Sequence, residues 1–302
     1  MNNDFCSHPR VLIWRKVSIF APVKPIIKIF LAFIVMTTSA LVCRAQITDV
    51  QGVIDSDSVR RDFDNQPFFG LYKDNYFVFG TAVNSKPSRE NSNVKFQISI
   101  AQRLTKSTLP WGTYLYLFYS QKVFWNVLER SMPMTDLNFN PGIGLAKPIF
   151  VKNRFIGKLT LMLEHESNGR DGAASRSWNK VSLGANIIID PSFVIHGKVW
   201  IPIVDGENNK DILDYCGIYQ TGMNFTTLNN RLGFGITLVK RRGWQLNYNA
   251  IFEISYRLFK RDNQCLFLQF YNGYGEGLLA YKEFHSTVRV GIVIKPRLFS
   301  DY

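Results

Sequence analysis

Two kinds of side chain alternate along the stretch Leu159-Thr160-Leu161-Met162-Leu163-Glu164-His165-Glu166-Ser167. The odd positions are apolar as far as Leu163, and most of the even positions are polar. Side chains two residues apart on a β-strand point to the same face, so this alternation predicts a strand with one apolar and one polar face. His165 and Ser167 then continue the apolar row at the end of that strand.

The same period-two pattern recurs along most of the chain. Turn signals such as Arg241-Arg242-Gly243 separate the alternating segments. We expect about twelve strands, at residues 75–84, 93–103, 112–124, 138–146, 155–167, 178–189, 193–203, 213–222, 230–240, 243–257, 265–274 and 286–295.

Aromatic residues gather near the ends of these segments. They are Trp111, Trp125, Trp178, Trp200, Trp244 and Tyr274. Girdles of this kind, an even number of amphipathic strands and the absence of a long apolar run after residue 45 favour an all-β, twelve-stranded antiparallel transmembrane β-barrel. A soluble secreted β-sandwich or a lipocalin-like barrel is the alternative that the pattern leaves open.

The N-terminus has the three-part layout of a secretory signal. Basic residues precede an apolar run over residues 26–41, and Cys43-Arg44-Ala45 follows it with small residues where a signal peptidase would cut. We therefore expect a signal peptide at 1–45, a polar periplasmic segment at 46–74 that forms no strand, and the barrel at 75–302. An uncleaved membrane anchor is the alternative reading of the apolar run.

The chain is basic. Its formal net charge is +13, and removal of residues 1–45 lowers it to about +8. Anionic lipid head groups explain a basic surface in an exported protein as easily as nucleic acid does. No stripe of interleaved basic and aromatic residues is present, so the sequence predicts no nucleic-acid partner.

Two cysteines, Cys216 and Cys265, would remain in the mature chain. They fall in different predicted strands. They could form a disulfide in an oxidising compartment, or act as small apolar side chains, and the sequence leaves both open.

The end of the quoted strand holds a candidate catalytic group. His165 and Ser167 share a face, and Asn179 begins the next alternating segment, also on the apolar side. If the two strands form a hairpin, Asn179 reaches the imidazole, giving a nucleophile, a base and an orienting amide. On a membrane barrel that face contacts lipid, so the arrangement predicts an acyl ester of a membrane lipid as substrate. A polar cluster without catalytic work is the alternative.

The loop between these strands supplies further candidate groups. The backbone N–H of Gly169 can stabilise an oxyanion. Backbone carbonyls and serine hydroxyls of the loop suit a hard cation, although spacing alone does not specify calcium.

The run from His165-Glu166-Ser167-Asn168-Gly169-Arg170 to Ser175-Arg176-Ser177-Trp178-Asn179 closely resembles the signature of the outer membrane phospholipase A family. Three further blocks resemble family segments in the same order: Val94–Ser99, Tyr119–Trp125 and Gly273–Leu279. The resemblance implies a calcium-dependent hydrolase of phospholipids and lysophospholipids that is active as a homodimer in the Gram-negative outer membrane.

The resemblance also implies residue roles. Ser167 would be the nucleophile, His165 the base, Asn179 the orienting residue and Gly169 the oxyanion donor. Calcium (Ca2+) would bind the carbonyl of Arg170, the hydroxyl of Ser175 and, from the partner subunit, Ser131. Gln121 would form a hydrogen bond across the dimer.

Two positions depart from the family pattern. Gly172 and Asn208 stand where family members can carry acidic residues that help bind calcium in the monomer. A monomer-state calcium site is therefore in doubt, and the triad is unaffected. Two other functions stay open: a catalytically silent barrel that acts as a channel or binding scaffold, and a soluble secreted esterase.

Overall fold

The computed structural model describes residues 68–105, 109–151, 154–204, 207–227, 229–259 and 263–296. The chain divides into two compact units, residues 1–52 and 53–302, and every described residue belongs to the second unit. The expected signal peptide and residues 46–67 of the expected periplasmic segment lie outside the described residues, so both stay predictions.

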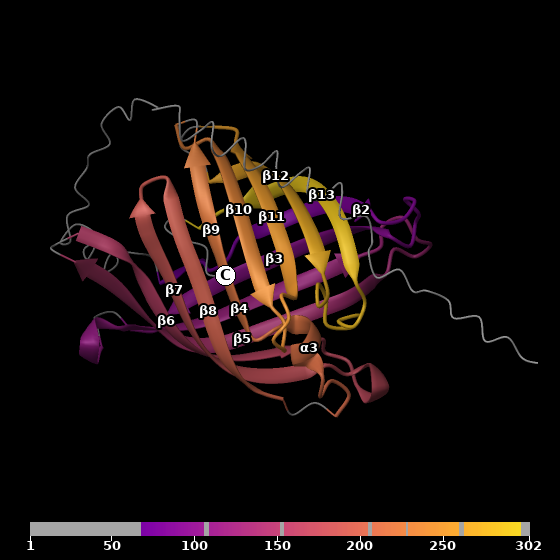
Figure 1. The fold of residues 1–302 in the computed structure, drawn as a ribbon, viewed down its shortest axis with the longest axis horizontal. Helices are drawn as coiled ribbons and strands as arrows, with labels where there is room; N and C mark the ends of the chain where they lie inside the picture. The colour runs from indigo at the N-terminus through magenta and orange to yellow at the C-terminus, as the bar shows by residue number, and fades with distance from the viewer. Residues whose placement is uncertain are drawn as a thin grey trace, which may run out of the picture. The chain divides into compact units, whose positions relative to one another are not determined.

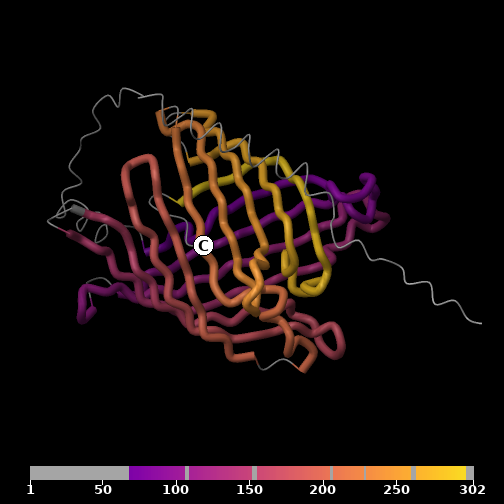
Figure 2. The backbone as a smooth tube through the Cα atoms, in the orientation of Figure 1, coloured from indigo at the N-terminus to yellow at the C-terminus, as the bar shows by residue number. Residues whose placement is uncertain are grey.

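Twelve antiparallel strands form one closed sheet (Figure 1; Figure 2). Each strand pairs with its neighbours in the chain, and β13 pairs with β2 to close the ring. The fold prediction is thus confirmed. The strands are β2 (Asn75–Ala82), β3 (Ser92–Arg103), β4 (Tyr114–Trp125), β5 (Met134–Val151), β6 (Arg154–Ser167), β7 (Ser177–Asp190), β8 (Phe193–Ile203), β9 (Tyr219–Thr227), β10 (Leu232–Lys240), β11 (Tyr248–Arg257), β12 (Gln264–Gly273) and β13 (His285–Ile294).

A short additional strand, β1 (Phe69–Leu71), lies inside the segment for which we expected none. It pairs with β3 beyond the point where β2 stops, and the register shifts by two residues between them. Tyr72, Lys73 and Asp74 occupy this break. The backbone N–H groups of Tyr72 and Lys73 donate hydrogen bonds to Ser99 of β3. The break is therefore a β-bulge, and β1 and β2 form one interrupted strand along β3.

The alternation in the sequence maps onto the two faces of the sheet. On β6 the outward side chains of Leu161 and Leu163 are 49% and 52% exposed, whereas the inward Met162 and Glu164 are 4% and 2% exposed. An outward apolar face and an inward polar face are the arrangement of a barrel that sits in lipid. Among the described residues, no helix is long and apolar enough to cross a membrane.

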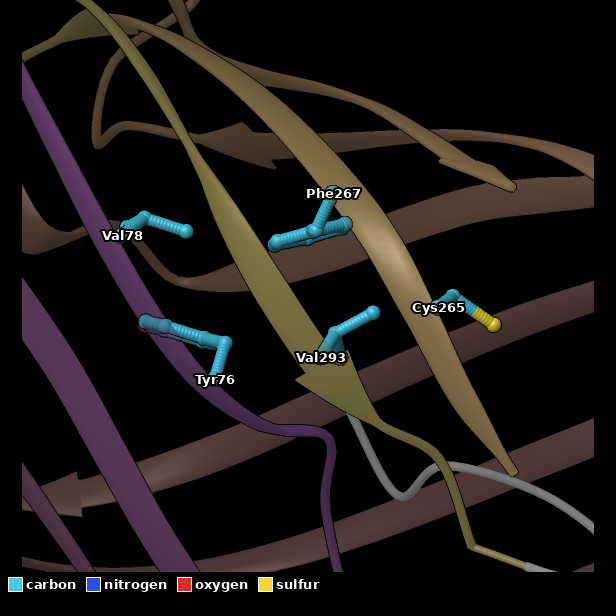
Figure 3. Packing of buried hydrophobic residues seen from close by; sticks show 5 residues of the cluster. All are labelled: Tyr76, Val78, Cys265, Phe267 and Val293. Atoms are coloured by element: carbon cyan, nitrogen blue, oxygen red, sulfur yellow. The ribbon is translucent and has the colours of Figure 1, made fainter. Parts of the chain in front are cut away.

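The interior contains apolar clusters as well as polar groups. Figure 3 shows one cluster, which lies between β2, β12 and β13 and consists of Tyr76, Val78, Cys265, Phe267 and Val293. Cys265 is buried in it, and Cys216 is also a free thiol. The two cysteines therefore form no disulfide, and Cys265 packs as a small apolar residue.

The aromatic girdle prediction was wrong for two tryptophans. Trp178 and Trp200 stand at even positions of their strands, point inward and line a lumen cavity of about 260 Å³. There Trp178 packs edge-to-face against Trp200. Strand parity outweighs the preference of indole for the lipid interface at these positions. Trp111 and Trp244, in contrast, are exposed.

Several predicted strand limits also differ from the structure, and the strand expected at 138–146 is longer at both ends, since β5 spans Met134–Val151. Residues expected to begin a strand at 213 form a short helix, α3 (Ile212–Cys216), which Gly217 ends with a φ of 90°. Residues 241–247 form a loop, so β11 begins later than expected. Two single turns of 3-10 helix, η1 (Pro110–Gly112) and η2 (Gly172–Ala174), lie in other connections.

Most of the longer connections gather at one end of the barrel, where β6 ends and β7 begins, and we call this end the site rim; the connection 104–113 lies at the opposite end. Those at the site rim are residues 83–91, 126–133, 168–176, 204–218, 241–247 and 274–284. The last of these folds over the lumen: Asp136 and Asn138 accept hydrogen bonds from the N–H groups of Leu279 and Leu278. The lumen is thus covered at the site rim by the chain itself.

Glu276 anchors this covering loop. Its carboxylate lies 3.0 Å from Lys95 Nζ and 2.6 Å from Arg289 Nη1, and all three side chains are buried. Burial alone would raise the pKa of Glu276, but the two cations hold it at about 2.

We expect Glu276→Gln to destabilise the barrel by about 3–5 kcal/mol, because it leaves two buried cations unpaired. Urea unfolding in detergent would measure this loss. Glu283→Gln is the matched control, since Glu283 is exposed on the same loop. As the pKa of Glu276 is lowered, its contribution should be present above pH 4.5 and fade as the pH falls towards 2. Equal stability of the two variants would contradict the anchoring role.

Candidate active site

His165 and Asn179 lie directly opposite each other on β6 and β7. The distance from His165 Nδ1 to Asn179 Oδ1 is 2.8 Å. An amide oxygen can only accept, so Nδ1 carries the proton in this bond and Nε2 is left as the basic nitrogen. The predicted pairing of the imidazole with the amide is therefore present in the structure.

Ser167 follows His165 on the same outward face, two residues further along β6. It is half-buried, and in the described part of the chain its hydroxyl makes no hydrogen bond. The imidazole and the hydroxyl thus share a face at the site rim without a bond between them. Catalytic hydrogen bonds are often long before substrate binds, so this spacing is compatible with a nucleophile and its base.

The end of β6 is held from β5. The side-chain amide of Asn140 donates to the backbone carbonyl of His165 at 2.9 Å. Phe139 pairs with Ser167, and its ring packs against Gly169, where a Cβ would come within 2.8 Å of the ring. Gly169 also has a φ of 65°, which a side chain would disfavour. Glycine is therefore required at this turn.

Charged pairs on the inward face support the same two strands. Glu166 lies 3.0 Å from Lys180 Nζ, and Glu164 lies 2.6 Å from Lys198 Nζ. Both carboxylates belong to β6, and their partners belong to β7 and β8. These bridges tie together the strands that carry His165 and Asn179.

The loop 168–176 is organised by a residue that our sequence analysis gave no role. Asn168 is buried, its amide nitrogen donates to Ala174 O, and its Oδ1 accepts from the N–H groups of Arg170 and Arg176. One side chain thus joins both ends of the loop. The available signal was that asparagine tends to bond to nearby backbone.

A second asparagine without a predicted role fixes the start of β7. Asn209 is fully buried, and its side chain bonds to both the N–H and the carbonyl of Ser177. Ser177 precedes Asn179 by two residues. No local sequence pattern reveals this contact, because the partners are 32 residues apart.

The loop also contains oxygens that suit calcium. The carbonyls of Gly172, Ala173, Ala174 and Ser175 each accept a hydrogen bond from the protein. Among the described residues, no group donates a hydrogen bond to the Arg170 carbonyl or the Ser175 hydroxyl. These two hard oxygen donors fit calcium. The described residues contain no metal-binding cluster of three or more His, Cys, Asp or Glu side chains.

Asn208 donates its side-chain amide to the carbonyl of Gly172 at 2.9 Å. These are the two positions that depart from the acidic family pattern. Here they bond to each other, so the loops are joined directly by a neutral hydrogen bond.

Ser131 and Gln121 lie apart from this loop. Ser131 is exposed at the tip of the connection 126–133, with a φ of 70°. Gln121 faces outward on β4 and accepts a hydrogen bond from Tyr119 Oη at 3.0 Å. Within the described residues, neither contacts Arg170 or Ser175. Both are on outer surfaces that another copy of the chain could reach.

Comparison with known proteins decides the family, since a family model described as Phospholipase A1 matches residues 65–294. The chain belongs to the phospholipase A1 family. Phospholipase A1 of Escherichia coli K12 is 28% identical over 276 residues, which cover 83% of this chain and 92% of that protein. The family resemblance predicted from the sequence is confirmed.

Two solved structures are similar. Outer membrane phospholipase A from Escherichia coli aligns with a TM-score of 0.66 at 25% identity, covering 76% of this chain and 99% of that one. The outer membrane phospholipase of Salmonella typhi, solved as a dimer with bound calcium, has a TM-score of 0.66 at 24% identity and covers 76% and 93%.

Family and fold together establish the broad activity and location. As a member of this family, the protein is a carboxylic ester hydrolase. Its closed twelve-stranded barrel places it in the outer membrane, where long connections typically face outward and short turns face the periplasm. A soluble secreted esterase is thereby excluded.

We expect Asn168→Ala to lower the hydrolytic rate by about 10²-fold, because small displacements of a positioned group have effects of this size. The substitution leaves the N–H groups of Arg170 and Arg176 without the acceptor that joins the two ends of the loop. Release of fatty acid from mixed micelles would measure the rate. Asn208→Ala is the control, since Asn208 is exposed and makes one bond to the same loop. A normal rate in Asn168→Ala would remove Asn168 from this role.

Proposed function

We propose that this member of the phospholipase A1 family is a calcium-dependent enzyme that hydrolyses acyl esters of glycerophospholipids and lysophospholipids through Ser167, His165 and Asn179. The observation that carries the proposal is the 2.8 Å bond between His165 and Asn179, on the lipid-facing side of the barrel and two residues from Ser167. Polar side chains on such a face are costly unless they bond to each other or act on substrate.

In the first half of the reaction, Ser167 Oγ attacks the ester carbonyl carbon. His165 Nε2 takes the hydroxyl proton and then gives it to the alcohol oxygen as the carbon–oxygen bond breaks. The products are an acyl-Ser167 and a lysophospholipid. In the second half His165 removes a proton from water, and the resulting attack releases a fatty acid and restores Ser167.

Asn179 and Gly169 would assist these steps in different ways. The Asn179 side-chain carbonyl holds His165 Nδ1–H and so keeps the tautomer in which Nε2 is basic. The Gly169 N–H donates to no acceptor in the described residues and follows Ser167 by two positions. It is the group we assign to the oxyanion of the tetrahedral intermediate.

Calcium would be held by the Arg170 carbonyl and the Ser175 hydroxyl, with Ser131 supplied by a second copy of the chain. When bound, it adds positive charge close to the developing oxyanion. The Salmonella typhi relative, solved as a dimer with bound calcium, supports calcium binding by a dimer. The outward Gln121 would join the two copies, because an amide that faces lipid gains from a polar partner.

A catalytically silent barrel that acts as a channel or scaffold is the second candidate. Its supporting observation is the lumen cavity of about 260 Å³, which is lined mostly by polar side chains. The loop that covers the lumen at the site rim opposes conduction, and the outward polar group has no part in a channel. Hydrolysis therefore explains more of the structure.

We expect Ser167→Ala to abolish turnover and leave barrel folding intact, since Ser167 lies at the rim. The loss of hydrolytic rate in Asn179→Ala should be about 10–100-fold smaller than in Ser167→Ala, because removing an orienting residue lowers the rate less than removing the nucleophile. Fatty-acid release would measure the rates, and heat-modifiable mobility on gels would control for folding. Wild-type turnover in Ser167→Ala would sink the assignment, and equal losses would contradict the division of roles.

Chelation of calcium should stop fatty-acid release and convert a dimer to a monomer. Half-maximal activity should need calcium on the order of 10⁻⁴ M or more, because no carboxylate is among the proposed ligands. Sedimentation in detergent, with and without a substrate analogue, would give the mass alongside activity. Magnesium is the control cation. Full activity in excess chelator would contradict the calcium requirement and favour a different catalytic arrangement.

A further inference from the structure

The loop between β10 and β11, residues 241–247, carries two fully exposed apolar side chains. Trp244 and Leu246 are 103% and 91% exposed, more than any other large apolar residue of the described chain. Both lie at the site rim. Neither side chain belongs to the catalytic group, which is formed by β6 and β7.

The loop is nevertheless firmly held. The buried ammonium of Lys240 donates to the carbonyls of Arg241 and Gly243 and to Asn247 Oδ1. Arg242 Nε lies 2.6 Å from Asp214 Oδ1 on α3. These bonds fix the backbone, whereas the side chains of Trp244 and Leu246 stay exposed. A group that is ordered in advance loses less conformational entropy when it binds.

The direction of the loop follows from Lys240. Thr237 and Val239 line the lumen, so Lys240, one position later on β10, points outward. It stands in a row with Tyr219 and Tyr248 of the neighbouring strands. Because the carbonyls of Arg241 and Gly243 bond to an outward ammonium, this part of the loop lies on the lipid side of the rim, and Arg242 holds the loop to α3 behind it.

The surface next to the loop is apolar. Ile236, Leu238 and Ile254 occupy outward positions of β10 and β11. This face continues directly to the loop that bears Trp244 and Leu246. A barrel in the outer membrane meets the boundary between acyl chains and head groups at this level, and indole rings favour that boundary.

We propose that the loop 241–247 docks into the membrane lipid at the site rim, with Trp244 and Leu246 inserted among the head groups and upper acyl chains. The occupant is lipid, because the loop overhangs a lipid-facing strand pair. The loop is four strands away from the β6–β7 hairpin around the ring, so this contact is separate from substrate binding.

Fluorescence of the full barrel in lipid vesicles tests the proposal. Wild type and Trp244→Phe would be reconstituted at low protein density in vesicles of phosphatidylcholine and phosphatidylglycerol, with and without bromine on the upper acyl chains. The difference between the two spectra reports Trp244 alone. We expect brominated lipid to lower this difference emission roughly twofold, since insertion reaches the head-group and acyl boundary. Aqueous iodide should have little effect.

Leu246→Ser should weaken the quenching by brominated lipid, and Gln245→Ser, the matched control on the same loop, should not. Heat-modifiable mobility checks that each variant is folded. Strong quenching by iodide, without quenching by brominated lipid, would place the loop in water and overturn the proposal. Protection from both quenchers would mean that protein covers the loop, for example a second copy, and would overturn it equally.

Discussion

A sheet in lipid has no water to satisfy its backbone, so every N–H and C=O group must find a partner within the chain. In this chain the pairing of β13 with β2 meets that requirement by removing both sheet edges. Closure then fixes which side chains face lipid and which face the lumen. The outward position of the proposed catalytic group follows from this division.

Polar groups are tolerated on the lipid side only where they are paired or lie near an end of the barrel. His165 and Asn179 meet both conditions, because they bond across the β6–β7 hairpin at the site rim. Lys240 meets them in another way, through the carbonyls of its own loop. The same constraint thus accounts for the paired side chains of the β6–β7 hairpin and for the loop bonded around Lys240.

Strand alternation predicted the twelve-stranded barrel and the face that carries His165, Ser167 and Asn179. The alternation could also have corrected the prediction that Trp178 belongs to an aromatic girdle. Trp178 lies two residues from the inward Lys180 on β7 and therefore shares its face. The short helix α3 left no signal in the pattern, since five residues span little more than one turn. The roles of Asn168 and Asn209 depend on partners that only the folded loops bring near. Backbone carbonyls such as that of Arg170 have no sequence signature, as any residue supplies one.

The outward position of Ser167 determines how reactants travel in the proposed mechanism. A phospholipid would arrive sideways from the surrounding leaflet, and the lysophospholipid and fatty acid would leave into it. The encounter is a diffusion problem in two dimensions. Its rate then follows the mole fraction of substrate in the surface around the barrel, whatever the total lipid in suspension, and the enzyme samples the composition of its own neighbourhood.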